Sequence, residues 1–397
     1  MIRSRLSLVF FAGAAIALIG CDRTELESAR DTGIQADMAR GQGGAGGEAG
    51  AGGAGGEGGQ AGAGAAGGLG GEGGSGGAGG EAGAGGGMPD AGITPDAGAL
   101  AATLPLGEVV ASRDCTNANL GECQRLTVQC PGQPDLEVTV QIASPEGEVR
   151  GTVIVGSGGA GTTPYSVQVI QGLQRAGFRV LHRVWADTWE HGAGGTAATA
   201  CRYATLTTWA RGEWAEGPLC VTGNSGGSAE ISYALARYGR DSVIDFAVPT
   251  SGPPMSRIDL GCIGGDEWTN VCMNALPADH CADNRGRICD FNGGNRALFD
   301  GGFEGTPCAD GDPAASGILR AGSVLSEDAV LSYPTTPVHF ILGREDCTSA
   351  MPHAMLFHDA ITSEKTITWV DAPHAMQRDP EGVVAIIDTL TSGCVER

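Results

Sequence analysis

The stretch Val221–Ser228, VTGNSGGS, constrains the fold more than any other part of this 397-residue chain. It has the form Gly-x-Ser-x-Gly, with Ser225 at its centre, between an apolar run at 218–221 and a helix-like run at 229–238. A serine in this setting sits on a tight turn, and the flanking glycines let strand and helix approach closely. We predict that the Ser225 hydroxyl projects above a sheet, at a helix N-terminus that favours negative charge. The alternative is an incidental serine in a glycine-rich turn.

The sequence of residues 1–20 is typical of an export signal. Arg3 and Arg5 precede an apolar core at 6–19, which is too short to span a bilayer comfortably. The core ends in Leu-Ile-Gly-Cys at 18–21, which resembles the lipobox of bacterial lipoproteins. That resemblance implies that Cys21 is lipidated and becomes the mature N-terminus. The alternative is an ordinary secretory signal, which would export the chain as well.

The composition of residues 21–102 predicts that this segment is a disordered tether. From 41 to 87 the sequence is almost entirely glycine and alanine, a composition that cannot bury enough apolar surface to offset chain entropy. A flexible tether of about 80 residues reaches roughly 50 Å. The net charge of −22 and the lack of basic clusters argue against nucleic acid and against electrostatic docking on a membrane.

Residues 103–397 are enough for one large α/β domain with an insertion. Of thirteen cysteines, all but Cys21 fall after residue 114, which leaves an even twelve. In an exported chain this indicates a framework of up to six disulfides. A zinc site is the rival interpretation, but the sequence has no Cys-x-x-Cys pair.

Apolar runs alternate with helix-like runs along this domain. Such alternation predicts a mostly parallel sheet covered by helices on both faces. We expect strands at 125–129, 136–142, 151–155, 178–184, 218–221, 243–248, 338–342 and 366–370, and helices at 166–176, 197–210, 229–238 and 382–390.

This order resembles the α/β-hydrolase family over nearly all of 125–394. The family carries a serine, an acid and a histidine in that order, each on a loop after a strand. The stretch HFILGRED at 339–346 resembles the acid-bearing strand and loop, and WVDAPH at 369–374 resembles the histidine loop. The resemblance implies the α/β-hydrolase fold. The catalytic residues that it implies are Ser225, Asp346 and His374.

These residue types fit nucleophilic catalysis. A serine hydroxyl is a poor nucleophile at neutral pH and needs a base within hydrogen-bond reach, here His374. Asp346 would hold the imidazole tautomer and stabilise the imidazolium. Glu345 and Asp371 are competing candidates for the acid, and a histidine of an ordinary surface loop is the alternative for His374.

An oxyanion hole is the third requirement of this chemistry. The resemblance implies one donor in the backbone N–H of Gly226. The second would come from the glycine loop at 156–161, where Gly159 is the first choice and Gly158 the next. A nucleotide-binding loop is the rival, but no Gly-Lys-Ser/Thr ending follows.

Residues 252–333 form an insertion where the family places lids and caps. The stretch is rich in Gly, Asp and Asn and poor in apolar residues, so we expect no core of its own and disulfides instead. It would overhang the catalytic face or form an outcrop away from it. Tryptophans that are candidates either for pocket walls or for plain core are Trp185, Trp189 and Trp268.

The fold that the resemblance implies also suggests one disulfide. The last helix of that fold packs beside the last strands, so we expect Cys347, next to Asp346, to pair with Cys394 at the end of that helix. Such a bridge would enclose the loop that carries His374. The alternative is that Cys347 pairs with the insertion.

Together these features predict an exported, lipid-anchored serine hydrolase of carboxylic esters, as in esterases, lipases and cutinases. We expect a small-molecule, lipid or polymer ester as substrate, a cell-envelope location with membrane contact through the lipid anchor, and a monomer. Nothing in the sequence calls for a metal or an organic cofactor. The alternatives are a serine peptidase of the same fold and a non-catalytic surface binding protein.

Overall fold

The computed structural model describes residues 103–117, 121–282 and 288–395. The expected export signal (1–20), the lipidation site Cys21 and the tether (21–102) lie outside the described residues. In the part of the chain that is described, no helix is long and apolar enough to cross a membrane.

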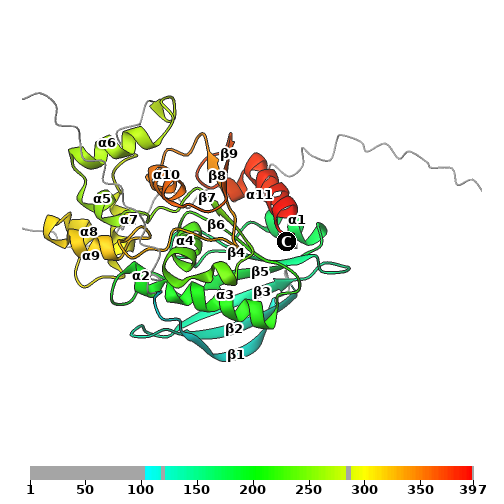
Figure 1. Cartoon of the computed structure of the whole chain (residues 1–397). Coiled ribbons are helices and arrows are strands. Elements are labelled where there is room, and N and C mark those ends of the chain that lie inside the picture. The colour runs from blue at the N-terminus through cyan, green and yellow to red at the C-terminus, as the bar shows by residue number, and fades with distance from the viewer. Residues whose placement is uncertain (1–102, 118–120, 283–287, 396–397) are drawn as a thin grey trace, which may run out of the picture. The chain divides into compact units, whose positions relative to one another are not determined.

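The described strands form a single nine-stranded sheet in the order β1-β2-β3-β5-β4-β6-β7-β8-β9 (Figure 1). The pairs β1–β2, β2–β3 and β3–β5 are antiparallel, and all remaining pairs are parallel. Strand β5 therefore lies between β3 and β4, and each later strand is added at the other side of β4. This arrangement is the α/β-hydrolase fold, which confirms the fold class expected from the sequence. The strands are β1 (Glu108–Asn117), β2 (Gly121–Gln129), β3 (Leu136–Ala143), β4 (Gly151–Gly156), β5 (Phe178–Trp185), β6 (Leu219–Asn224), β7 (Phe246–Thr250), β8 (Val338–Gly343) and β9 (Lys365–Val370).

Helices cover both faces of this sheet (Figure 1). Side chains of β4 alternate between the faces: Val153 and Val155 pack with α1 and α11, whereas Ile154 packs in the cluster that includes α3 and α4. The helices are α1 (Val167–Arg175), α2 (Thr196–Thr199), α3 (Cys201–Glu213), α4 (Gly226–Tyr238), α5 (Ile258–Ile263), α6 (Asp266–Ala275), α7 (Gly293–Asp300), α8 (Pro307–Asp310), α9 (Ser316–Ala321), α10 (Ala350–Ala360) and α11 (Pro380–Gly393).

Local sequence explains the ends of the helices beside the site. Asp379 caps α11 by accepting hydrogen bonds from the amides of Glu381 and Gly382, and Pro380 occupies the first helical position. Helix α4 ends at Tyr238 and is capped by Gly239, whose φ of 60° is the left-handed conformation that glycine adopts readily.

The helices α5 to α9 of the insertion were not expected from the sequence, and neither were two elements outside it. Strand β1 extends the sheet by an antiparallel edge, and most of its residues are exposed, so its apolar pattern is weak. Helix α10 follows the loop at 344–349, which carries Asp346 and is called the acid loop below. The helix packs Met351, Ala354 and Phe357 into the core.

Among the described residues, the insertion at 252–333 buries its apolar side chains in the same hydrophobic cluster as α3, α4 and α10 and has no separate cluster, as expected. Trp268, Phe291 and Phe299 are almost fully buried, and the two phenylalanine rings pack edge to face with centroids 4.6 Å apart. His353 of α10 lies against both Trp268 and Phe291, at 4.9 and 4.8 Å between ring centroids. These aromatic rings, together with buried aliphatic side chains such as Ile258 and Leu319, therefore extend the core of the main domain into the insertion.

All twelve cysteines after residue 114 form disulfides, six in number. Two of them, Cys262–Cys308 and Cys272–Cys289, lie within the insertion, as expected. The full set of pairs is Cys115–Cys123, Cys130–Cys201, Cys220–Cys394, Cys262–Cys308, Cys272–Cys289 and Cys281–Cys347.

The expected Cys347–Cys394 bridge is wrong. Cys394 is bonded to Cys220 of β6, and Cys347 to Cys281 of the insertion, which is the alternative considered above. Helix α11 has 14 residues and is therefore about 20 Å long, so it carries Cys394 from the carboxyl edge of the sheet back to the opposite edge. Cys347 stays at the carboxyl edge, beyond the reach of a disulfide.

Candidate active site

Ser225 lies between β6 and α4 in the backbone conformation expected of a serine on a tight strand-to-helix turn. Its φ of 54° and ψ of −114° are rare for a residue with a side chain. A Cβ atom on Gly223 would lie 2.6 Å from the carbonyl carbon of Gly227, so strand and helix meet only with glycine at 223. A Cβ atom on Gly227 would lie 2.7 Å from the carbonyl oxygen of Gly156, so glycine at 227 lets the helix pack against the end of β4. Close packing of the flanking glycines thus maintains the strained backbone conformation of Ser225 at the end of β6.

The two residues expected to form the oxyanion hole lie next to each other. A side chain on Gly226 would overlap the backbone of Gly159, with its Cβ 2.9 Å from the Gly159 nitrogen. A Cβ on Gly158 would lie 2.9 Å from the Cβ of Ser225. The glycine loop therefore packs directly on the turn that carries Ser225.

His374 and Asp346 are in direct contact. The Asp346 side chain is fully buried, and its Oδ2 accepts a hydrogen bond from His374 Nδ1 at 2.8 Å. A carboxylate can only accept, so Nδ1 carries the proton and Nε2 keeps a free lone pair. One third of the His374 side chain is exposed (33%), so Nε2 is available as a base.

Ser225 shares the carboxyl edge of the sheet with this pair. It follows β6, Asp346 follows β8 and His374 follows β9, and these strands are parallel neighbours with β7 between the first two. Within the described residues the hydrogen bonds of the His374 ring go to Asp346 and Thr348, and none joins it to Ser225. Catalytic hydrogen bonds are often long before substrate binds.

The competing acids stand apart from His374. Glu345 is exposed, and Asp371 forms an ion pair with Arg344, 3.1 Å between Oδ1 and Nε, in which both side chains are mostly exposed. Of the three acids considered, Asp346 is the one that contacts the histidine.

Thr348 completes the surroundings of the acid and was not anticipated. Its backbone N–H and its hydroxyl both donate to Asp346 Oδ1, at 3.1 and 2.8 Å, which leaves Oδ2 for His374. An aspartate that bonds the backbone two residues ahead is a common turn pattern, so Asp-x-Thr was a usable signal.

The insertion reaches the acid loop. His280 Nε2 donates to the backbone oxygen of Asp346 at 2.9 Å, and the neighbouring Cys281 is bonded to Cys347. The ring of His280 also lies 5.7 Å from that of Trp369 in β9. The insertion is therefore anchored at the site and is not an outcrop away from it.

The tryptophans considered as pocket walls belong to the core. Trp185, Trp189 and Trp268 are all buried, with at most 1% of the residue exposed. Trp189 Nε1 donates to the carbonyl of Gly159 at 3.3 Å, so this residue supports the glycine loop from behind.

No protein-family model matches the chain, and no curated protein sequence matches it. Solved structures similar to it include the alpha/beta hydrolase domain-containing protein 10 from mouse, with 13% identity and a TM-score of 0.40 over 71% of this chain and 97% of that one. A carboxyl esterase from Bacillus coagulans in complex with glycerol has 14% identity and a TM-score of 0.45 over 69% and 99%. Est1E from Butyrivibrio proteoclasticus has 12% identity and a TM-score of 0.39 over 68% and 96%. With TM-scores this low the similarities carry no argument, and the fold class follows from the strand order.

Proposed function

We propose that this chain is an exported, lipid-anchored serine hydrolase that cleaves carboxylic esters through an acyl-enzyme. The observation that carries the proposal is the hydrogen bond from His374 Nδ1 to the buried carboxylate of Asp346, on the sheet edge where Ser225 is held in a strained turn. The close packing of Gly159 against Gly226 supports it further.

The mechanism follows from these groups. Ser225 Oγ attacks the acyl carbon, and Nε2 of His374 takes the hydroxyl proton while the carbonyl electron pair moves onto oxygen. The N–H groups of Gly226 and Gly159 stabilise that oxyanion. As it collapses, the bond to the alkoxy oxygen breaks and the proton passes from His374 to the leaving alcohol. Water then repeats the sequence on the acyl-enzyme and releases the acid.

The test uses purified protein from residue 101 onward and a fluorophosphonate probe beside short-chain and long-chain esters. We expect the probe to label Ser225, and Ser225→Ala and His374→Ala to abolish hydrolysis without unfolding the domain. A label on another residue, or a Ser225→Ala variant with its rate intact, would overturn the proposal. Peptide substrates in the same assay decide between an esterase and a peptidase.

The anchor is proposed on the Leu-Ile-Gly-Cys sequence at 18–21. Export itself is supported by the six disulfides, which form and persist in oxidising compartments. We expect the mature protein to partition into detergent and Cys21→Ser to release it, because each lipid CH₂ that is buried adds about 0.8 kcal/mol. Recovery of the unaltered protein wholly in the aqueous phase would contradict the anchor.

A further inference from the structure

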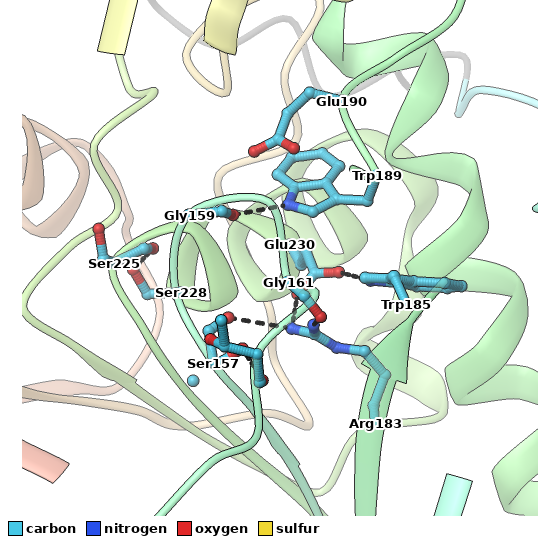
Figure 2. A network of polar contacts seen from close by, with 12 residues as sticks. Ser157, Gly159, Gly161, Arg183, Trp185, Trp189, Glu190, Ser225, Ser228 and Glu230 are labelled. Carbon is cyan, nitrogen blue, oxygen red and sulfur yellow. Dashed lines mark hydrogen bonds and ion pairs between the residues drawn. The ribbon is translucent and has the colours of Figure 1, made fainter. Parts of the chain in front are cut away.

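A buried arginine lies behind the glycine loop. Arg183 of β5 is fully buried, and its guanidinium donates to two carbonyls of the loop, from Nη1 to Gly161 at 2.9 Å and from Nη2 to Ser157 at 3.3 Å (Figure 2). Gly156 is also packed against it, because a Cβ there would overlap the guanidinium. The arginine therefore fills the space under both ends of the loop.

The remaining carbonyls of the loop are also occupied. The backbone N–H of Trp185 donates to Gly161 at 3.1 Å, and Trp189 donates to Ala160 through its backbone at 3.3 Å and to Gly159 through Nε1 at 3.3 Å. Gly158 accepts from the N–H of Gly161 at 3.2 Å. Each carbonyl from 157 to 161 thus has a donor.

Fixing the carbonyls also fixes the amides. In a trans peptide the N–H points away from the carbonyl of the same plane. The Gly159 N–H shares its plane with the Gly158 carbonyl, which turns inward to Gly161, so this N–H is directed out of the turn. The loop is therefore held in one conformation before any substrate binds, which is what an oxyanion hole requires.

The same arginine reaches the helix that carries the other donor. Arg183 Nη2 forms an ion pair with Oε2 of Glu230, a fully buried carboxylate of α4, and Trp185 Nε1 donates to its Oε1 at 2.5 Å (Figure 2). Helix α4 begins at Gly226, directly after Ser225. One buried ion pair thus connects the glycine loop to the helix that supplies the Gly226 N–H.

Burial of such a pair needs a reason other than stability. Removing two charges from water costs energy that their attraction recovers only in part. Burial raises the pKa of Glu230 to about 7, and Arg183 and the Trp185 hydrogen bond both oppose that rise. An apolar pair of the same volume would stabilise the core at least as well, but it could not orient backbone carbonyls.

We propose that Arg183 and Glu230 are positioning residues of the oxyanion hole, which hold the Gly159 N–H in register with the Gly226 N–H. The inference rests on the proposed serine-hydrolase function. Neither side chain touches the reacting atoms, and both act through the backbone of the glycine loop and of α4.

The first test compares two lysine substitutions. Arg183→Lys keeps the charge but loses the planar fork that contacts the loop twice. We expect kcat for a short-chain ester to fall about 10- to 100-fold with KM nearly unchanged, since the oxyanion exists only after attack. The matched control is Arg237→Lys. Arg237 is a nearly buried arginine of α4, the helix of Glu230, and it donates to the carbonyls of Ala321 and Ser323 away from the loop. This substitution should lower Tm and leave kcat unchanged.

A second variant covers the case in which Arg183→Lys does not fold because the charge of Glu230 is left without a well-placed partner. Arg183→Met combined with Glu230→Gln removes both charges together, and we expect the same selective loss of kcat. Equal kcat in this variant, in Arg183→Lys and in the control would overturn the inference.

Hydrogen–deuterium exchange separates this inference from the proposed function. The amides of Gly161, Trp185 and Trp189, which donate to carbonyls of the loop, should exchange faster in Arg183→Lys than in Arg237→Lys, whether or not any ester is hydrolysed. An inactive wild type with that exchange difference would refute the hydrolase function while supporting the loop's dependence on Arg183. Unchanged exchange would refute the positioning role even in an active enzyme.

Discussion

Cys281 of the insertion is covalently joined to Cys347, the residue that directly follows the buried carboxylate of Asp346. His280 adds a hydrogen bond to the Asp346 backbone from the same segment. The loop that orients His374 is therefore held from the insertion as well as from β8.

We expect the double variant Cys281→Ser/Cys347→Ser to lose ester turnover by about 10-fold or more, because small displacements of an orienting group are costly. The bridge spans 66 residues, for which the chain-entropy model gives about 4 kcal/mol of stability. Cys115→Ser/Cys123→Ser is the control, since that bridge joins β1 and β2 at the far edge of the sheet. Turnover measured well below each variant's Tm should fall only in the first; an equal fall in both would contradict a role at the acid loop.

Asp346→Asn should lower kcat by roughly 10⁴-fold, because the amide favours the wrong tautomer of His374. Glu345→Gln on the loop of Asp346 and Asp371→Asn on the loop of His374 are matched controls and should change kcat by little. Steady-state kinetics on one ester decides the matter. Unaltered turnover in Asp346→Asn would remove Asp346 from the mechanism.

Thr348→Val should lower kcat about 10-fold, since the hydrogen bond from its hydroxyl to the charged Asp346 Oδ1 is lost. Thr348→Ser keeps that hydroxyl and should retain most of the activity. Rescue by serine distinguishes orientation of the carboxylate from loss of side-chain volume. If serine and valine behave alike, the hydroxyl has no part in orienting Asp346.

The ionisation of Glu190 makes the free energy of unfolding depend on pH. Burial raises the pKa of its carboxyl group to about 8, against the hydrogen bond from Thr188 and the attraction of Arg183, while Glu230 adds repulsion. Between pH 4.5 and about 8 the folded protein therefore binds a proton that the unfolded chain releases, and the free energy of unfolding falls as pH rises through this window.

Glu190→Gln cannot titrate and keeps an acceptor for Thr188. Its free energy of unfolding relative to the wild type should increase from pH 5 to pH 8, by up to about 1.4 kcal/mol per pH unit. Urea unfolding of both proteins at the two pH values measures this difference, in which the titration of groups that do not interact with Glu190 cancels. A difference that does not change with pH would mean that Glu190 is ionised throughout.

The fold class and the grouping of Asp346 with His374 could be predicted from the family resemblance, because the motifs that carry it are local. A Gly-x-Ser-x-Gly turn after an apolar run specifies strand, turn and helix within a dozen residues, and parallel strands then bring loop residues to one edge. Strand β1 escaped prediction because its exposed edge residues lack the alternation of a half-buried strand.

Disulfide pairing and polar burial depend on the folded chain. Which edge of the sheet Cys394 reaches follows from the length and direction of α11, so the packing of the last helix beside the last strands was a poor guide to its partner. Arg183 did leave a usable signal, since a charged residue inside the apolar run FRVLHRVW requires a buried partner. The sequence does not indicate that the partner is Glu230.

The Cys220–Cys394 bond closes the chain into a covalent ring that begins before Ser225 and ends after α11. Ser225, Asp346 and His374 all lie inside this ring, as does the whole insertion. One proteolytic cut anywhere between 221 and 393 would leave both fragments attached to each other through this bond. A chain nicked in the insertion would therefore keep Ser225, Asp346 and His374 on one covalent molecule.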